Sequence, residues 1–218
     1  MLLAPLYDLP TRSASGYLLR YVVPRSAPPQ LLGPLDRRQP FQMLTMGDTI
    51  IGVGHGSPSE FCGHNDQVIM DTLSIPNVRG KVVILISCET AKELGPAIIQ
   101  AGAASYIGFK EDLVWICDSD LAATPWTDKT FAAPCLMPIS NCVNAVLDGK
   151  PTGEAFDMLI EDLSRNALAE ENDLIRSCIN FNKKNAVLLG DPAARVRARP
   201  KITLPIPPPP IVIPFLRG

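Results

Sequence analysis

The sequence predicts an α/β fold in which a mostly parallel sheet carries helices on both faces. Two short apolar runs, residues 48–53 and 82–86, have the length and β-branched composition of buried parallel strands. The second run is followed by a segment with helical character, 93–101, and then by a third apolar run, 105–109. Strand, helix and strand in this order form a right-handed crossover unit, which places both strands in a parallel sheet.

Further segments extend this pattern on both sides. Near the N-terminus, Tyr17–Val23 is bounded by a glycine and a proline and is typical of a first or edge strand. Apolar residues at helical spacing predict outer helices over 138–147 and from 153 to about 176, and 186–189 is expected to be a last strand. Residues 110–134 are expected to be irregular, and long loops inside a compact domain tend to carry function.

Proline and charge divide the chain into three parts. Of the 22 prolines, 14 lie in residues 1–40 and 200–218. We therefore expect a proline-rich N-terminal arm with one strand over 1–40, the main domain over 41–199, and an extended tail over 200–218. Both ends are basic, whereas residues 41–192 hold ten more acidic than basic residues. Basic ends on an acidic body are suited to folding back or to binding a partner.

The composition argues against several function classes. Aromatic residues make up 6% of the chain and its body is acidic, so a nucleic-acid interface is not expected. No stretch is long and apolar enough to span a bilayer, and the N-terminus lacks the charged start and apolar core of a signal peptide. The six cysteines are then expected to be thiols in a reducing compartment, with the cytoplasm as the expected location.

Two of the apolar runs end close to a reactive side chain. His55 follows the run 48–53, and Cys88 follows the run 82–86. Neighbouring parallel strands deliver their carboxyl ends to one edge of the sheet, where a ligand crevice opens. A thiol has a pKa of about 8.5, and a nearby imidazole can lower that pKa or take the proton during attack. The pattern therefore predicts the Cys–His dyad of a cysteine peptidase.

The same segments resemble the caspase-like fold of clan CD cysteine peptidases, nearest to the gingipain and CHAT-domain branches. Four pieces carry the resemblance in the expected order: the run ending in His55-Gly56, the run ending in Ser87-Cys88, AGAASYIGF over 101–109, and VLLGDPAARV over 187–196. The last piece is similar to the glycine-aspartate-proline ending of gingipain-type catalytic domains. The resemblance covers roughly residues 48–196 and implies a three-layer sandwich, with the catalytic domain in the central part of the chain.

The resemblance also implies roles for individual residues. Cys88 is the expected nucleophile and His55 the general base or acid, hydrolysing a peptide or protein substrate through a covalent acyl-enzyme. The backbone amides of Gly56 and Cys88 are the expected oxyanion donors, each worth roughly 3 kcal/mol or more in the transition state. This chemistry requires no metal or organic cofactor. The candidate substrate-binding residues are Glu89, Trp115 and His64.

Other interpretations of these residues stay open at the level of sequence. His64 is also typical of a residue that braces its own loop, and Trp115 and Trp126 suit simple packing as well as a substrate cleft. The two histidines, together with Cys62 and Cys88, are all of zinc-ligand type, although their spacing matches no common structural zinc motif. We therefore expect the dyad and no metal.

Departures from the family pattern favour a second hypothesis. Ile86 stands where metacaspase-type enzymes carry an acidic residue, two places before the cysteine. Glu89 follows the cysteine directly, and a carboxylate beside a thiolate raises the pKa of the thiol. These differences are typical of a caspase-like domain that no longer cuts. Such a domain would serve as a binding or assembly module, docking through the tail 200–218 onto a protein partner or a second copy of itself.

Overall fold

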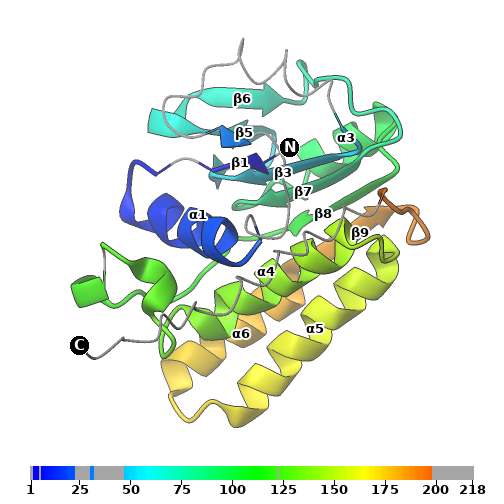
Figure 1. The fold of residues 1–218 in the computed structure, drawn as a ribbon. Helices are drawn as coiled ribbons and strands as arrows, with labels where there is room; N and C mark the ends of the chain where they lie inside the picture. Colours follow the sequence, from blue (N-terminus) through cyan, green and yellow to red (C-terminus); the bar gives the residue numbers. More distant parts are fainter. Residues whose placement is uncertain (1, 5, 23–29, 32–46, 122, 198–218) are drawn as a thin grey trace, which may run out of the picture.

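The computed structural model describes residues 2–4, 6–22, 30–31, 47–121 and 123–197. Its main sheet consists of β1 (Leu2–Leu3), β2 (Gln30–Leu31), β3 (Thr49–Val53), β7 (Val82–Ile86), β8 (Ser105–Phe109) and β9 (Ala186–Gly190). The spatial order is β2-β1-β3-β7-β8-β9 (Figure 1). All neighbours are parallel except β8 and β9, which are antiparallel. The predicted α/β fold with a mostly parallel sheet is confirmed.

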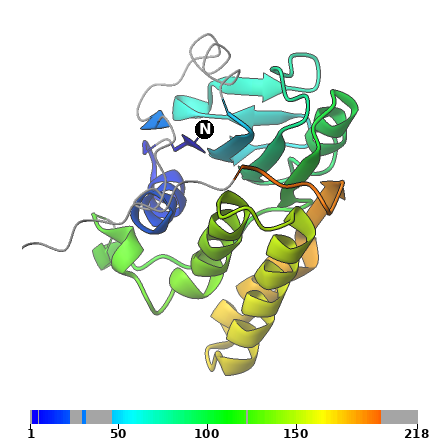
Figure 2. The ribbon, with the colours of Figure 1, turned by 45° about the vertical axis from the view of Figure 1, so that its right-hand side comes forward.

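The side chains of the central strands alternate between two hydrophobic cores. Ile84 and Ile86 belong to one core, whereas Val83 and Leu85 belong to the other, because successive side chains of a strand point to opposite faces. The first core is covered by α1 (Leu9–Tyr21), α4 (Ala133–Leu147), α5 (Thr152–Ala169) and α6 (Asp173–Asn185). Figures 1 and 2 both show α4, α5 and α6 packed side by side.

The opposite face of the sheet is covered by one helix and a small antiparallel sheet. These elements are α3 (Leu94–Gln100), β4 (His55–Gly56), β5 (Glu60–Cys62) and β6 (Val68–Asp71). Phe61, Ile69 and Met70 from the small sheet are buried in the second core, together with Leu94 and Ile98 of α3. The three-layer arrangement expected from the sequence is thus present, with helices on both faces.

The first helix overturns one prediction, because residues 17–21 of the expected strand Tyr17–Val23 lie in α1. Asp8 caps this helix: its Oδ1 accepts a hydrogen bond from the Thr11 amide at 2.9 Å, and Pro10 stands in the first turn. Both features are helix-start signals. The buried apolar side chains of the helix and its C-cap recur at helical spacing: Ala14, Tyr17, Leu18 and Val22. The strand prediction was wrong because it relied on the apolar run and did not take these helix-start signals into account.

Helix α4 begins at Ala133, five residues before the predicted start at Pro138. Pro138 has no amide hydrogen, so the carbonyl of Pro134 loses its intrahelical partner. The side-chain amide of Asn166, on α5, donates a hydrogen bond to that carbonyl at 2.8 Å. A contact from the neighbouring helix therefore allows α4 to continue through an internal proline.

The remaining segments follow the predictions with small differences. The predicted helical segment from 153 to about 176 contains two helices, and Asn172 caps the second by accepting from the Leu174 amide at 2.9 Å. Between β8 and α4, the described residues hold two short 3-10 helices, η3 (Ser119–Leu121) and η4 (Pro125–Thr127). The predicted domain boundaries near residues 40 and 200, and the proline-rich tail, lie outside the described residues.

In the described part of the chain, no helix combines the length and the apolar character needed to traverse a bilayer.

Candidate active site

The strands β3 and β7 carry His55 and Cys88 to equivalent positions at one edge of the sheet. Val53 pairs with Ile86 in the parallel register, and each reactive residue follows its strand end by two positions. The Gly54 amide continues the ladder by donating to the Ile86 carbonyl at 3.3 Å. His55 and Cys88 both line one cavity of about 350 Å³. The structure therefore brings the two side chains to the same cavity.

A carboxylate that the sequence prediction missed contacts the imidazole of His55. Oδ2 of Asp8 lies 2.6 Å from Nε2 of His55. Burial raises the pKa of Asp8, but hydrogen bonds from Thr11 and His55 outweigh it and leave the pKa below its usual value. An ionised carboxylate only accepts, so Nε2 carries the proton in this pair. In neutral His55, Nδ1 is then the nitrogen free to act as a base.

Tyr7 lies between the two histidines of the chain. Its ring meets His55 edge-on at a centroid distance of 5.8 Å and His64 at 5.0 Å. The Tyr7 hydroxyl donates to Oδ1 of Asp66 at 2.6 Å, which ties the segment before α1 to the loop after β5. His64 stands at the start of η2 (His64–Asp66), and its Nδ1 is buried without a hydrogen-bond partner among the described residues. These contacts fit the bracing interpretation of His64.

The turn that carries Cys88 is fixed by buried hydroxyl groups. The Thr90 hydroxyl is 2.9 Å from the Ser87 hydroxyl and accepts a hydrogen bond from Tyr106 at 2.9 Å. All three residues are buried. Glu89 adopts the left-handed conformation at φ 56°, which is uncommon for a residue with a side chain. The hydroxyl groups therefore hold a turn whose backbone is locally strained.

The Glu89 side chain points to an ion pair rather than to the cavity. Its Oε1 lies 2.5 Å from Nζ of Lys92, which also reaches Glu111 at 3.0 Å. Trp115 lines the cavity together with His55 and Cys88. The other predicted site residues, Glu89, His64 and Gly56, are not among the described residues that line it.

The environment of the Cys88 sulfur opposes ionisation. Burial is the largest influence on this thiol and raises its pKa. A hydrogen bond from the Leu113 amide to the sulfur lowers the pKa. The carboxylate of Asp112, which accepts a hydrogen bond from the thiol, raises the pKa further, as does Glu89. The net effect is a pKa above the usual value for cysteine. The structure therefore contains a thiol that is mainly protonated at neutral pH.

Removing the Asp112 charge should make Cys88 more reactive. We expect Asp112→Asn to speed alkylation of Cys88 at pH 7 by about three- to tenfold, because a lower pKa gives more thiolate and one pKa unit is about a tenfold change. The measurement is the rate of alkylation of each cysteine by iodoacetamide, monitored by mass spectrometry. Asp120→Asn, an exposed acid on the same segment, is the matched control and should leave the rate unchanged. An unchanged or slower rate in Asp112→Asn would contradict this account.

The backbone around Gly56 is packed closely against the Cys88 turn. A Cβ at this position would collide with the carbonyl of Cys88 and would lie 2.7 Å from Cγ2 of Thr90 and 3.1 Å from Cβ of Ser87. Only glycine allows β4 to approach the turn this closely. The Cys88 amide donates no hydrogen bond to a backbone carbonyl of the described residues. The Cys88 amide is thus available as an oxyanion donor.

The zinc alternative would need several ligand side chains gathered at one place. Within the described ranges, no group of three or more histidine, cysteine, aspartate or glutamate residues is arranged to hold a metal ion. None of the six cysteines, all of which are described, is in a disulfide.

Of the two tryptophans, Trp115 lines the cavity with Cys88, whereas Trp126 lines a separate cavity beside α1.

Three solved structures share this architecture. Gingipain R, an Arg-specific cysteine proteinase, matches over 91% of this chain and 47% of its own, with 12% identity and a TM-score of 0.57. A complex of gingipain pro- and mature domains from Porphyromonas gingivalis matches over 91% and 48%, with 11% identity and a TM-score of 0.58. A structure described only as a protease matches over 90% and 48%, with 13% identity and a TM-score of 0.55.

The chain has the caspase-like fold. This confirms the resemblance expected from the sequence, and at 11–13% identity the likeness shows the fold alone. The chain spans about half the length of the solved chains it matches. No family model matches its sequence. No curated protein matches it either.

Proposed function

We propose that this caspase-like chain is a cysteine peptidase that uses Cys88 as nucleophile and His55 as general base and acid. One observation carries the proposal: the two residues follow adjacent parallel strands at equivalent register positions and line one cavity. The fold is shared with solved cysteine proteinases. The substrate class that fits a thiol nucleophile with a neighbouring imidazole is a peptide or protein.

The proposed reaction proceeds through a thioester. The Cys88 thiol gives its proton to Nδ1 of His55, and the sulfur attacks the scissile carbonyl carbon. The resulting oxyanion accepts hydrogen bonds from the amides of Gly56 and Cys88. His55 then returns the proton to the leaving nitrogen as the carbon–nitrogen bond breaks. Water adds to the thioester, which releases the carboxylic acid and regenerates the thiol.

Asp8 is a positioning residue in this proposal. Its carboxylate, 2.6 Å from Nε2, holds the imidazole in one orientation and one tautomer. The helix cap at Asp8 and the contact with His55 depend on the same carboxyl group. The first turn of α1 and the proposed base are therefore held together by one side chain.

A second candidate function is a caspase-like binding module without hydrolytic activity. The raised pKa of Cys88 favours it, because burial and the carboxylates of Asp112 and Glu89 all keep the thiol protonated. In this case the proline-rich tail 200–218 is the proposed docking segment for a protein partner or a second copy. Both proposals suit a reducing compartment such as the cytoplasm, since all six cysteines are free thiols.

The alkylation rate of each cysteine between pH 5 and pH 9, in wild type and in His55→Ala, separates the two functions. If the dyad operates, Cys88 reacts faster than the other cysteines below about pH 7 and loses that advantage in His55→Ala. His64→Ala, which removes the other histidine, is the matched control and should keep the advantage. Cys135 and Cys142 serve as inert references, because burial raises the pKa of each thiol to about 12. An average or slow Cys88 in the wild type would support the binding module instead.

A further inference from the structure

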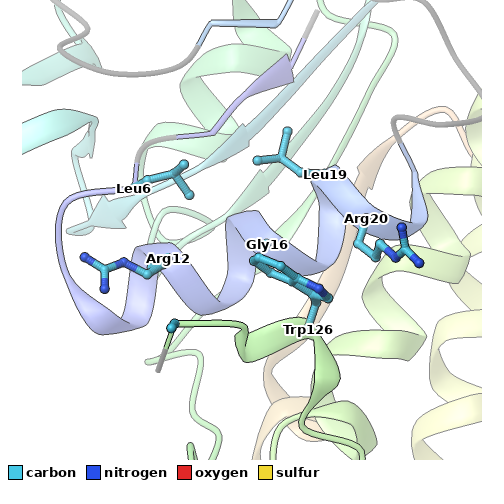
Figure 3. A pocket seen from close by; sticks show the side chains of 7 residues that line it. Leu6, Arg12, Gly16, Leu19, Arg20 and Trp126 are labelled. Atoms are coloured by element: carbon cyan, nitrogen blue, oxygen red, sulfur yellow. The ribbon is translucent and has the colours of Figure 1, made fainter. Parts of the chain in front are cut away.

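Another cavity lies beside α1 and is separate from the cavity with Cys88. It measures about 550 Å³, within the range of about 300–1,000 Å³ that is usual for ligand sites. Figure 3 shows residues that line it: Leu6, Arg12, Gly16, Leu19, Arg20 and Trp126. Pro10, Thr11 and Ala14, also on α1, line the cavity with Cys88 instead. The same helix thus contributes to two different cavities.

The centre of this cavity is apolar and rigid. Trp126 packs directly on the helix backbone, since a Cβ at Gly16 would lie only 2.8 Å from its Cε3 atom. The Tyr21 hydroxyl donates to the Trp126 carbonyl at 3.1 Å, which fixes η4 against α1. Leu6, at 38% exposure, and Leu19 add aliphatic surface. A fixed tryptophan beside one exposed and one half-buried leucine is the kind of surface that anchors a partner side chain.

Two guanidinium groups flank this apolar centre. Arg12 and Arg20 are exposed, and neither side chain has an ion pair or hydrogen bond with any other described residue. Figure 3 shows them on either side of Gly16 and Trp126. The two arginines are eight residues apart on one helix, which corresponds to about 12 Å along its axis. A ligand that spans the cavity therefore meets a cation at each end and an apolar surface between them.

We propose that this cavity binds an extended peptide segment of a partner protein that carries an acidic residue, an apolar residue and a second acidic residue at alternate positions. An extended chain advances about 3.3 Å per residue, and alternate side chains point to one face. Acidic residues four positions apart are then about 13 Å apart, close to the spacing of the two arginine positions along the axis of α1, and the residue midway between them faces Trp126. Arginine recognises carboxylates through paired hydrogen bonds, which suits this charge pattern.

The proposal goes beyond the peptidase proposal and does not depend on it. The lining of this cavity is distinct from that of the cavity with His55 and Cys88. Peptide binding is therefore expected to be the same in Cys88→Ala as in the wild type. Loss of hydrolysis and loss of peptide binding can then be told apart.

The test is the affinity of the full chain for the peptide acetyl-Gly-Glu-Ser-Phe-Ser-Glu-Gly-amide, measured by isothermal titration calorimetry at low salt. We expect saturable binding to the wild type that weakens about tenfold in Arg12→Ala and about tenfold in Arg20→Ala, as is typical for loss of one charge-assisted contact. Arg79→Ala, an exposed arginine before β7, is the matched control and should leave the affinity unchanged. A peptide with glutamine in place of both glutamates should bind at least tenfold more weakly.

Two outcomes would overturn the proposal. One is the absence of saturable binding to a wild-type chain with a cooperative unfolding transition. The other is binding that is equally strong in Arg12→Ala, Arg20→Ala and Arg79→Ala, which would indicate a non-specific charge effect. Because both cavity arginines are exposed, neither substitution is expected to impair folding.

Discussion

Cys88→Ala is expected to abolish peptide hydrolysis by the chain, lowering the rate by about 10³-fold or more, because the acyl-enzyme cannot form without the sulfur. The assay is release of fluorescence from labelled casein or from a peptide library. The variant should lose hydrolysis but keep its fold, since removing one half-buried sulfur costs only about 1 kcal/mol of folding free energy. Circular dichroism and the thermal unfolding midpoint of the variant would verify that the fold is kept.

Cys178→Ala is the matched control for this experiment. Cys178 is also a free, half-buried thiol, but it lies on α6 and not beside His55. Its replacement should leave hydrolysis unchanged. If Cys88→Ala retained wild-type activity, the proposed nucleophile would be wrong. If the wild type and both variants were all inactive towards a broad substrate set, the binding module would be the better account.

Phe61→Ala is expected to have the largest effect on stability, lowering the free energy of unfolding by about 3–5 kcal/mol. Its ring is completely buried, and a glycine in β3 and another just after β3 leave room for it. A Cβ at Gly52 would lie 2.7 Å from Cζ of the ring, and a Cβ at Gly54 would lie 3.1 Å from Cε2. Removal of the ring therefore opens a cavity between β3 and β5, which the rigid strands cannot fill.

Urea unfolding followed by circular dichroism would measure this loss. Leu73→Ala is the control, since Leu73 follows β6 and is 96% exposed. Its replacement should change the free energy of unfolding by less than about 0.5 kcal/mol. A cost below about 1 kcal/mol for Phe61→Ala would show that the small sheet is not held by this ring. Since His55 begins that sheet, Phe61→Ala should also reduce the difference in alkylation between Cys88 and the other cysteines.

The strands were predictable because their signals are local. The runs that became β3, β7 and β8 are continuous and apolar, and each is buried along its whole length. The prediction failed at α1, although Asp8 and Pro10 were sequence signals for a helix start. The antiparallel direction of β9 could not be predicted, because the residues of a strand do not by themselves encode the direction of its neighbour.

The candidate site was predictable only in part, because some of its contacts join residues that are distant in the sequence. His55 and Cys88 were found because each closely follows an apolar strand, and parallel strands end at one edge of the sheet. Asp8 was missed because it reaches His55 from a segment 47 residues away in the chain. Asp112 was missed because it reaches Cys88 from the loop after β8. Such contacts depend on how separate elements pack.

The sequence by itself determined the core strands β3, β7, β8 and β9 and the reactive residues that follow β3 and β7, because continuous apolar runs bounded by turn-forming residues are signals that act within about ten residues. Only the tertiary structure decided which side chains surround those residues. The carboxylate beside the Cys88 thiol and the tryptophan between Arg12 and Arg20 come from segments that are distant in the chain. Burial and neighbouring charges set the reactivity of a thiol and the binding preference of a cavity, and both quantities exist only once the elements are packed.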